Sequence, residues 1–147
     1  MPDATTSSGH VLRLERRFKA VRERVFKAWT EPEAMKRWKA PGEAECALAE
    51  ADVRVGGTYR IHMRGPDGTV YRLIGEYREI EEPSRLVYTW KWEHEPDPVE
   101  TLVTVEFNAV GAETDVILTQ TGFTDADDRN RHEMGWSGSF EKLARVV

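Results

Sequence analysis

The fold is decided by one stretch of sequence, TYRIHMRGPDGTVYRLIGEYREI at residues 58–80. Apolar residues at positions 59, 61 and 63 alternate with polar ones at 60, 62 and 64, which is the period of a strand with one buried face. Gly65-Pro66-Asp67-Gly68 is a hairpin turn signal, and Val70 to Ile80 continues as a long strand in which Gly75 marks a bend. The stretch therefore predicts an antiparallel hairpin.

Further strand patterns lie on both sides of this hairpin. Upstream, residues 10–18 form a first strand, and residues 44–55 contain a short one. Downstream, alternating apolar residues run through 86–93, 103–107 and 116–120, with turn signals between them. Because successive strands joined by tight turns pair antiparallel, these segments predict an antiparallel sheet of about seven strands.

Helical periodicity appears in three places. Residues 22–29 repeat an apolar residue every four positions, and a second short helix follows, with Thr30 as its predicted N-cap. The C-terminal segment begins at Thr124 as predicted N-cap and presents a stripe of His132, Trp136, Phe140 and Leu143. The predicted fold is α+β: a curved sheet wrapped around a long C-terminal helix, with two short helices after the first strand. One helix cannot fill a wide concave face, so we expect an apolar cavity between them.

Composition bounds the function. The 147 residues suit one domain, here residues 10–147, preceded by a disordered tail of small polar residues at 1–9. A net charge of −5 argues against binding nucleic acid, and no apolar run approaches the roughly 20 residues of a membrane span. The N-terminus lacks the pattern of a secretory signal, which predicts a cytoplasmic protein. Cys46 is the single cysteine, so neither a disulfide nor a multi-cysteine metal site is expected.

Catalytic signatures are incomplete, and we expect neither a cofactor nor a metal. His132-Glu133-Met134-Gly135-Trp136 begins like a zinc-protease helix but ends in tryptophan instead of the second histidine. The inward-facing residues instead suggest the wall of a site for a small hydrophobic or aromatic molecule, although aromatic side chains also fill ordinary cores. The candidate ligand contacts are Trp38, Tyr59, Met63, Tyr71, Trp90, Gln120, His132 and Trp136.

Four segments in order resemble a known family. They are RVFKAWTEPE at 24–33, DVRVGGTY at 52–59, GEYREI at 75–80 with LVYTW at 86–90, and TQTGF at 119–123 followed by His132, Gly135 and Trp136. The chain thus resembles the START-like (Bet v 1-like, SRPBCC) superfamily, and within it small bacterial homologues of the activator of Hsp90 ATPase. The resemblance implies a helix-grip fold and diverse hydrophobic ligands. Hsp90 is not expected as a partner, because the chain is too short for the additional N-terminal domain of the co-chaperone.

Two positions depart from the family pattern. Many relatives have histidine where Gln120 stands, and an aromatic residue often follows the tryptophan at the position of Lys39. Both substitutions are expected to alter the mouth or the polarity of a pocket.

Two other functions remain open from the sequence. A polyketide-cyclase-like enzyme would use His132 or Tyr88 as proton carrier and Gln120 as orienting donor. An interaction module related to chaperone activation would present an exposed apolar patch. A homodimer is compatible with the sequence but not required by it.

Overall fold

The computed structural model describes residues 10–147, so the predicted tail at residues 1–9 lies outside the described residues. The strands are β1 (His10–Phe18), β2 (Glu45–Ala51), β3 (Thr58–Arg64), β4 (Val70–Glu81), β5 (Arg85–Trp92), β6 (Thr101–Val110) and β7 (Glu113–Phe123). The helices are α1 (Arg22–Thr30), α2 (Pro32–Trp38) and α3 (Ala126–Val146).

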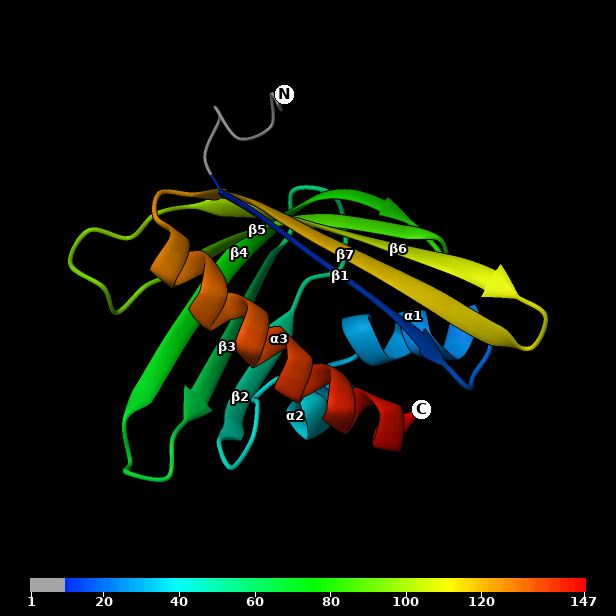
Figure 1. Ribbon diagram of the computed structural model, residues 1–147, viewed down its shortest axis with the longest axis horizontal. Helices are drawn as coiled ribbons and strands as arrows, with labels where there is room; N and C mark the ends of the chain where they lie inside the picture. The colour runs from blue at the N-terminus through cyan, green and yellow to red at the C-terminus, as the bar shows by residue number, and fades with distance from the viewer. Residues whose placement is uncertain (1–9) are drawn as a thin grey trace.

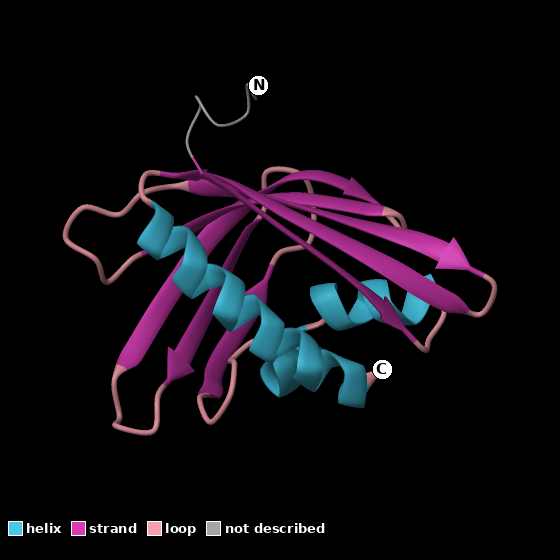
Figure 2. Ribbon diagram, in the orientation of Figure 1, coloured by secondary structure: helices cyan, strands magenta, loops and turns pink. Residues whose placement is uncertain are grey.

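All seven strands form one antiparallel sheet in the order β1-β7-β6-β5-β4-β3-β2. Strands β2 to β7 each pair with their neighbour in the chain, whereas β1 crosses to pair with β7 and places Leu12 opposite Gln120. Figure 2 shows the sheet curved behind the helices. The predicted helix-grip architecture is therefore confirmed, including the two short helices after the first strand.

Helix α3 crosses the concave side of the sheet (Figure 1). Its backbone packs against β1 at one edge of the sheet and against α2, but it stays farther from β3, β4 and β5. Two polar groups fix its middle: Ser139 Oγ donates to the carbonyl of Lys39 at 3.2 Å, and Lys142 Nζ donates to the carbonyl of Ala40 at 2.6 Å. The helix is thus attached at one side and leaves space at the other.

Two predicted helix caps were wrong by one residue. Asp125, not Thr124, caps α3, because its carboxylate accepts the backbone N–H of Asp128 at 2.7 Å. Glu31, not Thr30, occupies the N-cap position of α2, while the Thr30 hydroxyl donates to the carbonyl of Phe26 in the preceding helix. The reason is that α1 continues through Thr30 and α2 starts directly at Pro32, which leaves a single residue between them.

The core beneath the C-terminal half of α3 is built from aromatic rings. The ring centroid of Phe140 lies 5.7 Å from that of Phe18 and 5.8 Å from that of Trp29, and both pairs pack edge to face. Trp29 in turn contacts Phe107 of β6 at 5.4 Å. We call Phe18, Trp29, Phe107 and Phe140 the C-terminal cluster. None of these four side chains is more than 2% exposed, so this part of the concave face is filled.

No helix in the described part of the chain has both the length and the apolar character to cross a membrane.

Candidate functional site

A cavity of about 310 Å³ lies between the N-terminal half of α3 and strands β3 to β5. That volume falls at the lower end of the ~300–1,000 Å³ typical of small-molecule sites. Its lining residues come from the α2–β2 loop, the sheet, the β5–β6 loop and α3: Lys39, Pro41, Ala44, Met63, Tyr71, Trp90, Trp92, His94, Glu95, Asp128, Arg131, His132, Gly135, Trp136 and Ser139.

The cavity has two chemically different ends. Tyr71, His94, Glu95 and Arg131 form the mouth, where all but His94 are solvent-exposed. Lys39, Trp136 and Ser139, each at most 4% exposed, form the inner end. Asp128 and Ser139 are separated by about three helical turns, so the lining stripe of α3 extends over about 16 Å. The cavity therefore suits an elongated molecule that enters beside the start of α3.

A glycine on α3 leaves space in the part of the cavity wall that the helix forms. Gly135 lies on the lining stripe, and a Cβ added there would meet only the Pro41 ring at 3.9 Å, an ordinary contact distance. Gly138, one turn along, has a different role, because an added Cβ would lie 3.1 Å from Pro41 Cβ. Gly138 lets the α2–β2 loop approach α3, while Gly135 keeps the cavity free of a side chain.

The apolar wall is a set of indole rings. The ring centroid of Trp90 lies 5.0 Å from that of Trp136, so the two rings pack against each other, and 5.6 Å from that of Trp92 on the same strand. Tyr71 contacts Trp92 at 6.3 Å toward the mouth. The indole N–H of Trp90 is buried and has no hydrogen-bond partner among residues 10–147. The wall thus offers aromatic area to the cavity, while the Trp90 N–H itself is sealed within the wall.

His132 is held at both ring nitrogens. Trp92 Nε1 donates to His132 Nε2 at 2.9 Å, so that nitrogen is the acceptor. Nδ1 lies 2.8 Å from the carbonyl oxygen of Asp128 and is therefore the N–H donor. This arrangement fixes a neutral tautomer and occupies both nitrogens. In this state His132 contributes a ring face to the cavity wall instead of a free base.

Gln120 is also fully engaged, away from the cavity. Its side chain is 0% exposed; Oε1 accepts from Trp136 Nε1 at 2.8 Å, and Nε2 donates to Thr101 Oγ1 at 2.8 Å. Thr101 Oγ1 then donates to the carbonyl of Trp90 at 3.3 Å. The amide therefore fixes the orientation of Trp136 and links it to the strand that carries Trp90.

Lys39 is the buried charge of the site. Its Nζ lies 4.7 Å from the ring centroid of Trp38, 5.3 Å from Trp136, and 5.6 Å from both Trp29 and Tyr88. These rings favour the ammonium form, but burial dominates and lowers the pKa of Lys39 to about 7. The nearby Cys46 thiol supplies no counter-charge at neutral pH, because burial raises its pKa. No hydrogen bond or ion pair joins the Lys39 amine to another side chain among residues 10–147, and the amine is not one of the polar atoms sealed from solvent without a partner, in keeping with its place in the cavity lining.

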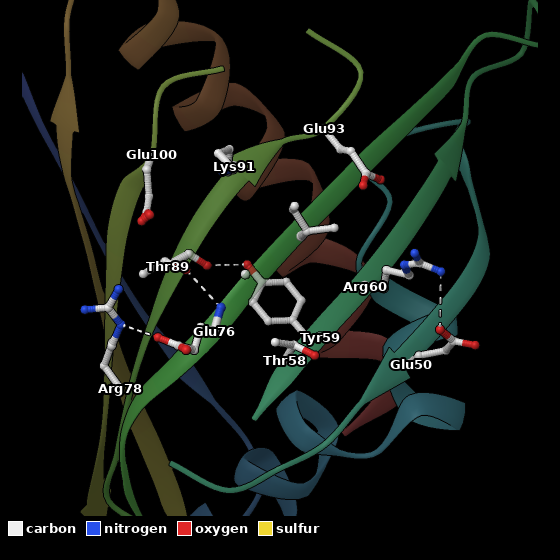
Figure 3. A pocket seen from close by; sticks show the side chains of 12 residues that line it. Glu50, Thr58, Tyr59, Arg60, Glu76, Arg78, Thr89, Lys91, Glu93 and Glu100 are labelled. Carbon is white, nitrogen blue, oxygen red and sulfur yellow. Dashed lines mark hydrogen bonds and ion pairs between the residues drawn. The ribbon is translucent and has the colours of Figure 1, made fainter. Parts of the chain in front are cut away.

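A second hollow lies on the outer face of the sheet, with Tyr59 at its base (Figure 3). The Tyr59 hydroxyl donates to the carbonyl of Thr89 at 2.6 Å, beside Gly75. A Cβ at Gly75 would lie 2.0 Å from that carbonyl oxygen, which explains the glycine where the sequence predicted a bend. Charged residues around this hollow pair with one another, as Arg78 does with Glu76 at 2.9 Å. The inner cavity, with its aromatic wall, is therefore the candidate site.

The structure distributes the eight predicted contacts over four places. Met63, Tyr71, Trp90, His132 and Trp136 line the cavity. Tyr59 borders the outer hollow, and Gln120 lies behind Trp136. Trp38 lies under the Lys39 amine, and its indole N–H donates to the carbonyl of Ala28 at 2.8 Å. Alternation along a strand identifies an inward side chain, but it does not distinguish a cavity wall from the layer behind it.

Lys39 was not among the predicted contacts. The available signal was its departure from the family pattern at a position next to a buried tryptophan. Tyr88, the other proton carrier considered, does not line the cavity; its hydroxyl accepts from Trp29 Nε1 at 3.3 Å, and burial raises its pKa.

Comparisons with known proteins agree with this fold. A protein from Chromobacterium violaceum has a solved structure that matches with a TM-score of 0.87 and 29% identity, over 93% of this chain and 96% of that chain. A protein from Rhizobium loti matches with a TM-score of 0.80 and 28% identity, over 94% and 96%. An AHSA1 protein from Silicibacter pomeroyi matches with a TM-score of 0.81 and 26% identity, over 92% and 96%. The search of curated proteins gave no match.

The family comparison covers most of the chain. The model for "Activator of Hsp90 ATPase homolog 1-like protein" matches residues 19–147, from the loop before α1 to the C-terminus. This range includes the two short helices, strands β2 to β7 and α3, which together carry the whole cavity lining. The chain therefore belongs to the family of activator of Hsp90 ATPase homolog 1-like proteins.

Proposed function

We propose that this protein binds a small hydrophobic or aromatic molecule in the cavity between α3 and strands β3 to β5. The observation that carries the proposal is a cavity of about 310 Å³, open at its mouth, whose wall includes the indole rings of Trp90, Trp92 and Trp136. Family membership supports it, because the fold is of a ligand-binding type.

The lining favours binding over turnover. An acid–base catalyst needs a titratable group free to exchange a proton with the bound molecule. Both nitrogens of His132 are hydrogen-bonded, to Trp92 and Asp128. The Gln120 amide is likewise hydrogen-bonded to Trp136 and Thr101. The indole rings of Trp90, Trp92 and Trp136 offer flat apolar area, which suits a planar guest.

Titration with N-phenyl-1-naphthylamine tests the proposal, because this uncharged probe becomes fluorescent on leaving water. We expect saturable binding, accompanied by a change in tryptophan emission from the three indoles of the wall. Gly135→Leu places a side chain in the cavity and should weaken binding of the probe by at least about tenfold.

Met134→Leu is the matched control, because Met134 neighbours Gly135 but is 76% exposed. We expect this variant to bind the probe as the original chain does. Equal affinity of Gly135→Leu and the original protein would place the probe elsewhere and overturn the proposal, as would the absence of saturable binding.

A further inference from the structure

The inner end of the cavity holds a cation without a partner. Lys39 is 4% exposed, and its ammonium is surrounded by the rings of Trp38, Trp136, Trp29 and Tyr88. Aromatic faces attract a cation but accept only weak hydrogen bonds, whereas an ammonium has three strong donors. An acceptor that enters the cavity can therefore receive a charge-assisted hydrogen bond from Lys39.

A second unsatisfied donor lies in the same wall. The buried indole N–H of Trp90 has no partner within residues 10–147, and Trp90 is 5% exposed. The Trp90 ring is 5.0 Å from that of Trp136, which is itself 5.3 Å from Lys39 Nζ. The Lys39 amine is therefore the donor at the inner end of the cavity, and the Trp90 N–H is a second unpaired donor that is buried within the adjoining wall.

We infer that the preferred ligand is an apolar or aromatic carboxylic acid, whose carboxylate lies inward on Lys39 and whose apolar part extends toward the mouth. This inference rests on the proposed function of the cavity. A carboxylate has two acceptor oxygens and the charge that the buried ammonium lacks. Because burial lowers the pKa of Lys39 to about 7, pairing with the acid also restores the proton that burial disfavours.

The charges at the other end support this orientation. Arg131, the cation at the mouth, already pairs with Asp128 at 3.1 Å. Glu95 adds a carboxylate there, so an anion at the mouth would face repulsion and find no free cation. The indole rings of Trp90 and Trp92 lie between the two ends and suit the apolar part of the ligand.

Calorimetric titration with 2-naphthoate and 2-naphthamide tests the inference, because the two probes share a shape and differ in charge. The original protein should bind 2-naphthoate at least about tenfold more tightly than 2-naphthamide, as charge-assisted hydrogen bonds exceed neutral ones. Lys39→Met keeps an unbranched side chain without the charge. It should remove that preference while changing the affinity for 2-naphthamide by less than about threefold.

Arg131→Met is the matched control, because it removes the cation at the mouth. We expect it to keep the preference for 2-naphthoate. Loss of the preference in Arg131→Met but not in Lys39→Met would place the anion at the mouth and overturn the inference. Equal affinity of the original protein for both probes would overturn it too, while leaving the cavity intact. Failure of both probes and of N-phenyl-1-naphthylamine would instead reject the proposed function.

Discussion

The two halves of α3 face the same sheet but meet it differently. In the C-terminal half, Phe140 and Leu143 are at most 2% exposed, and Phe140 packs edge to face against Phe18 and Trp29. In the N-terminal half, His132 and Trp136 border a cavity of about 310 Å³. The difference follows from what covers the sheet, since α1 and α2 lie on the concave face beside the C-terminal half, whereas no other helix of residues 10–147 lies beside the N-terminal half.

This contrast suggests that the C-terminal half of α3 contributes mainly to the stability of the fold, while the N-terminal half borders the proposed binding site. Polar contacts reinforce the division, because Lys142 and Ser139 tie the middle of α3 to the α2–β2 loop. The filled half can therefore hold the helix in place while the other half leaves room for a guest. Substitutions that remove the same amount of side chain should have unequal effects in the two halves.

The largest expected loss in the free energy of unfolding comes from a substitution in the filled, C-terminal half of α3. Leu143→Ala removes a fully buried side chain from close-packed surroundings and should lower the free energy of unfolding by about 4 kcal/mol. Met63→Ala removes a similar volume from a residue that already borders the cavity, and should cost only about 2 kcal/mol because less packing is lost. Urea denaturation of the two variants measures both values. Equal losses would mean that the two halves of α3 are equally well packed.

An intermediate effect is expected at Lys39, which lies where the two halves join. The pKa of Lys39 is about 7 in the folded protein, whereas an unfolded lysine keeps about 10.4. Between these values the unfolded chain binds more protons, so the contribution of Lys39 to stability rises with pH. The penalty for burying the ammonium is complete below pH 7 and disappears above about pH 10.4.

Lys39→Met should therefore stabilise the protein by about 3 kcal/mol at pH 6.5, and this gain should shrink by about 2 kcal/mol at pH 8.5. Other groups packed near Lys39 titrate too: burial raises the pKa of Cys46 and of Tyr88. Their contributions have the opposite sign and are present in both proteins, although loss of the Lys39 charge also removes an influence that lowers the pKa of Cys46. The comparison is therefore the difference between the two denaturation curves at each pH. A gain that does not change with pH would show that Lys39 titrates normally in the folded chain.

Much of the architecture was predictable because period-two and helical patterns are local. Alternation in residues 58–64 and the turn at 65–68 identify the β3–β4 hairpin directly, and the stripe from His132 to Leu143 identifies the buried face of α3. The caps were harder to predict. Thr124 and Asp125 are both good capping residues, and only the backbone conformation determines which carboxylate or hydroxyl reaches the free N–H.

The site was only partly predictable, because burial does not determine what a side chain touches. Tyr59 and Met63 share one face of β3, yet Met63 borders the cavity while Tyr59 turns its hydroxyl to Thr89 beside Gly75. Gln120 is inward as predicted, but two protein groups satisfy it. Lys39 directly follows a short helix, where a charged residue is expected to be exposed. The fold buries it by bringing Trp29, Tyr88 and Trp136 from three other elements to join the adjacent Trp38 around its amine.

The smallest expected effect is a difference in stability between alanine variants of Gly135 and Gly138, two glycines that lie one turn apart in α3. Replacing either Gly135 or Gly138 with alanine should gain about 1 kcal/mol from helix propensity. At Gly135 the new Cβ meets only the Pro41 ring at 3.9 Å, so the gain should be realised and the cavity should still accept N-phenyl-1-naphthylamine. At Gly138 the Cβ would lie 3.1 Å from Pro41 Cβ and 3.5 Å from the backbone N of Gly42, so displacement of the loop should cancel the gain.

Thermal unfolding of the two variants measures the difference directly, since their intrinsic helix gain is the same. If Gly138→Ala were as stabilising as Gly135→Ala, the α2–β2 loop would not be pressed against α3, and the boundary between the filled and the open half would lie elsewhere.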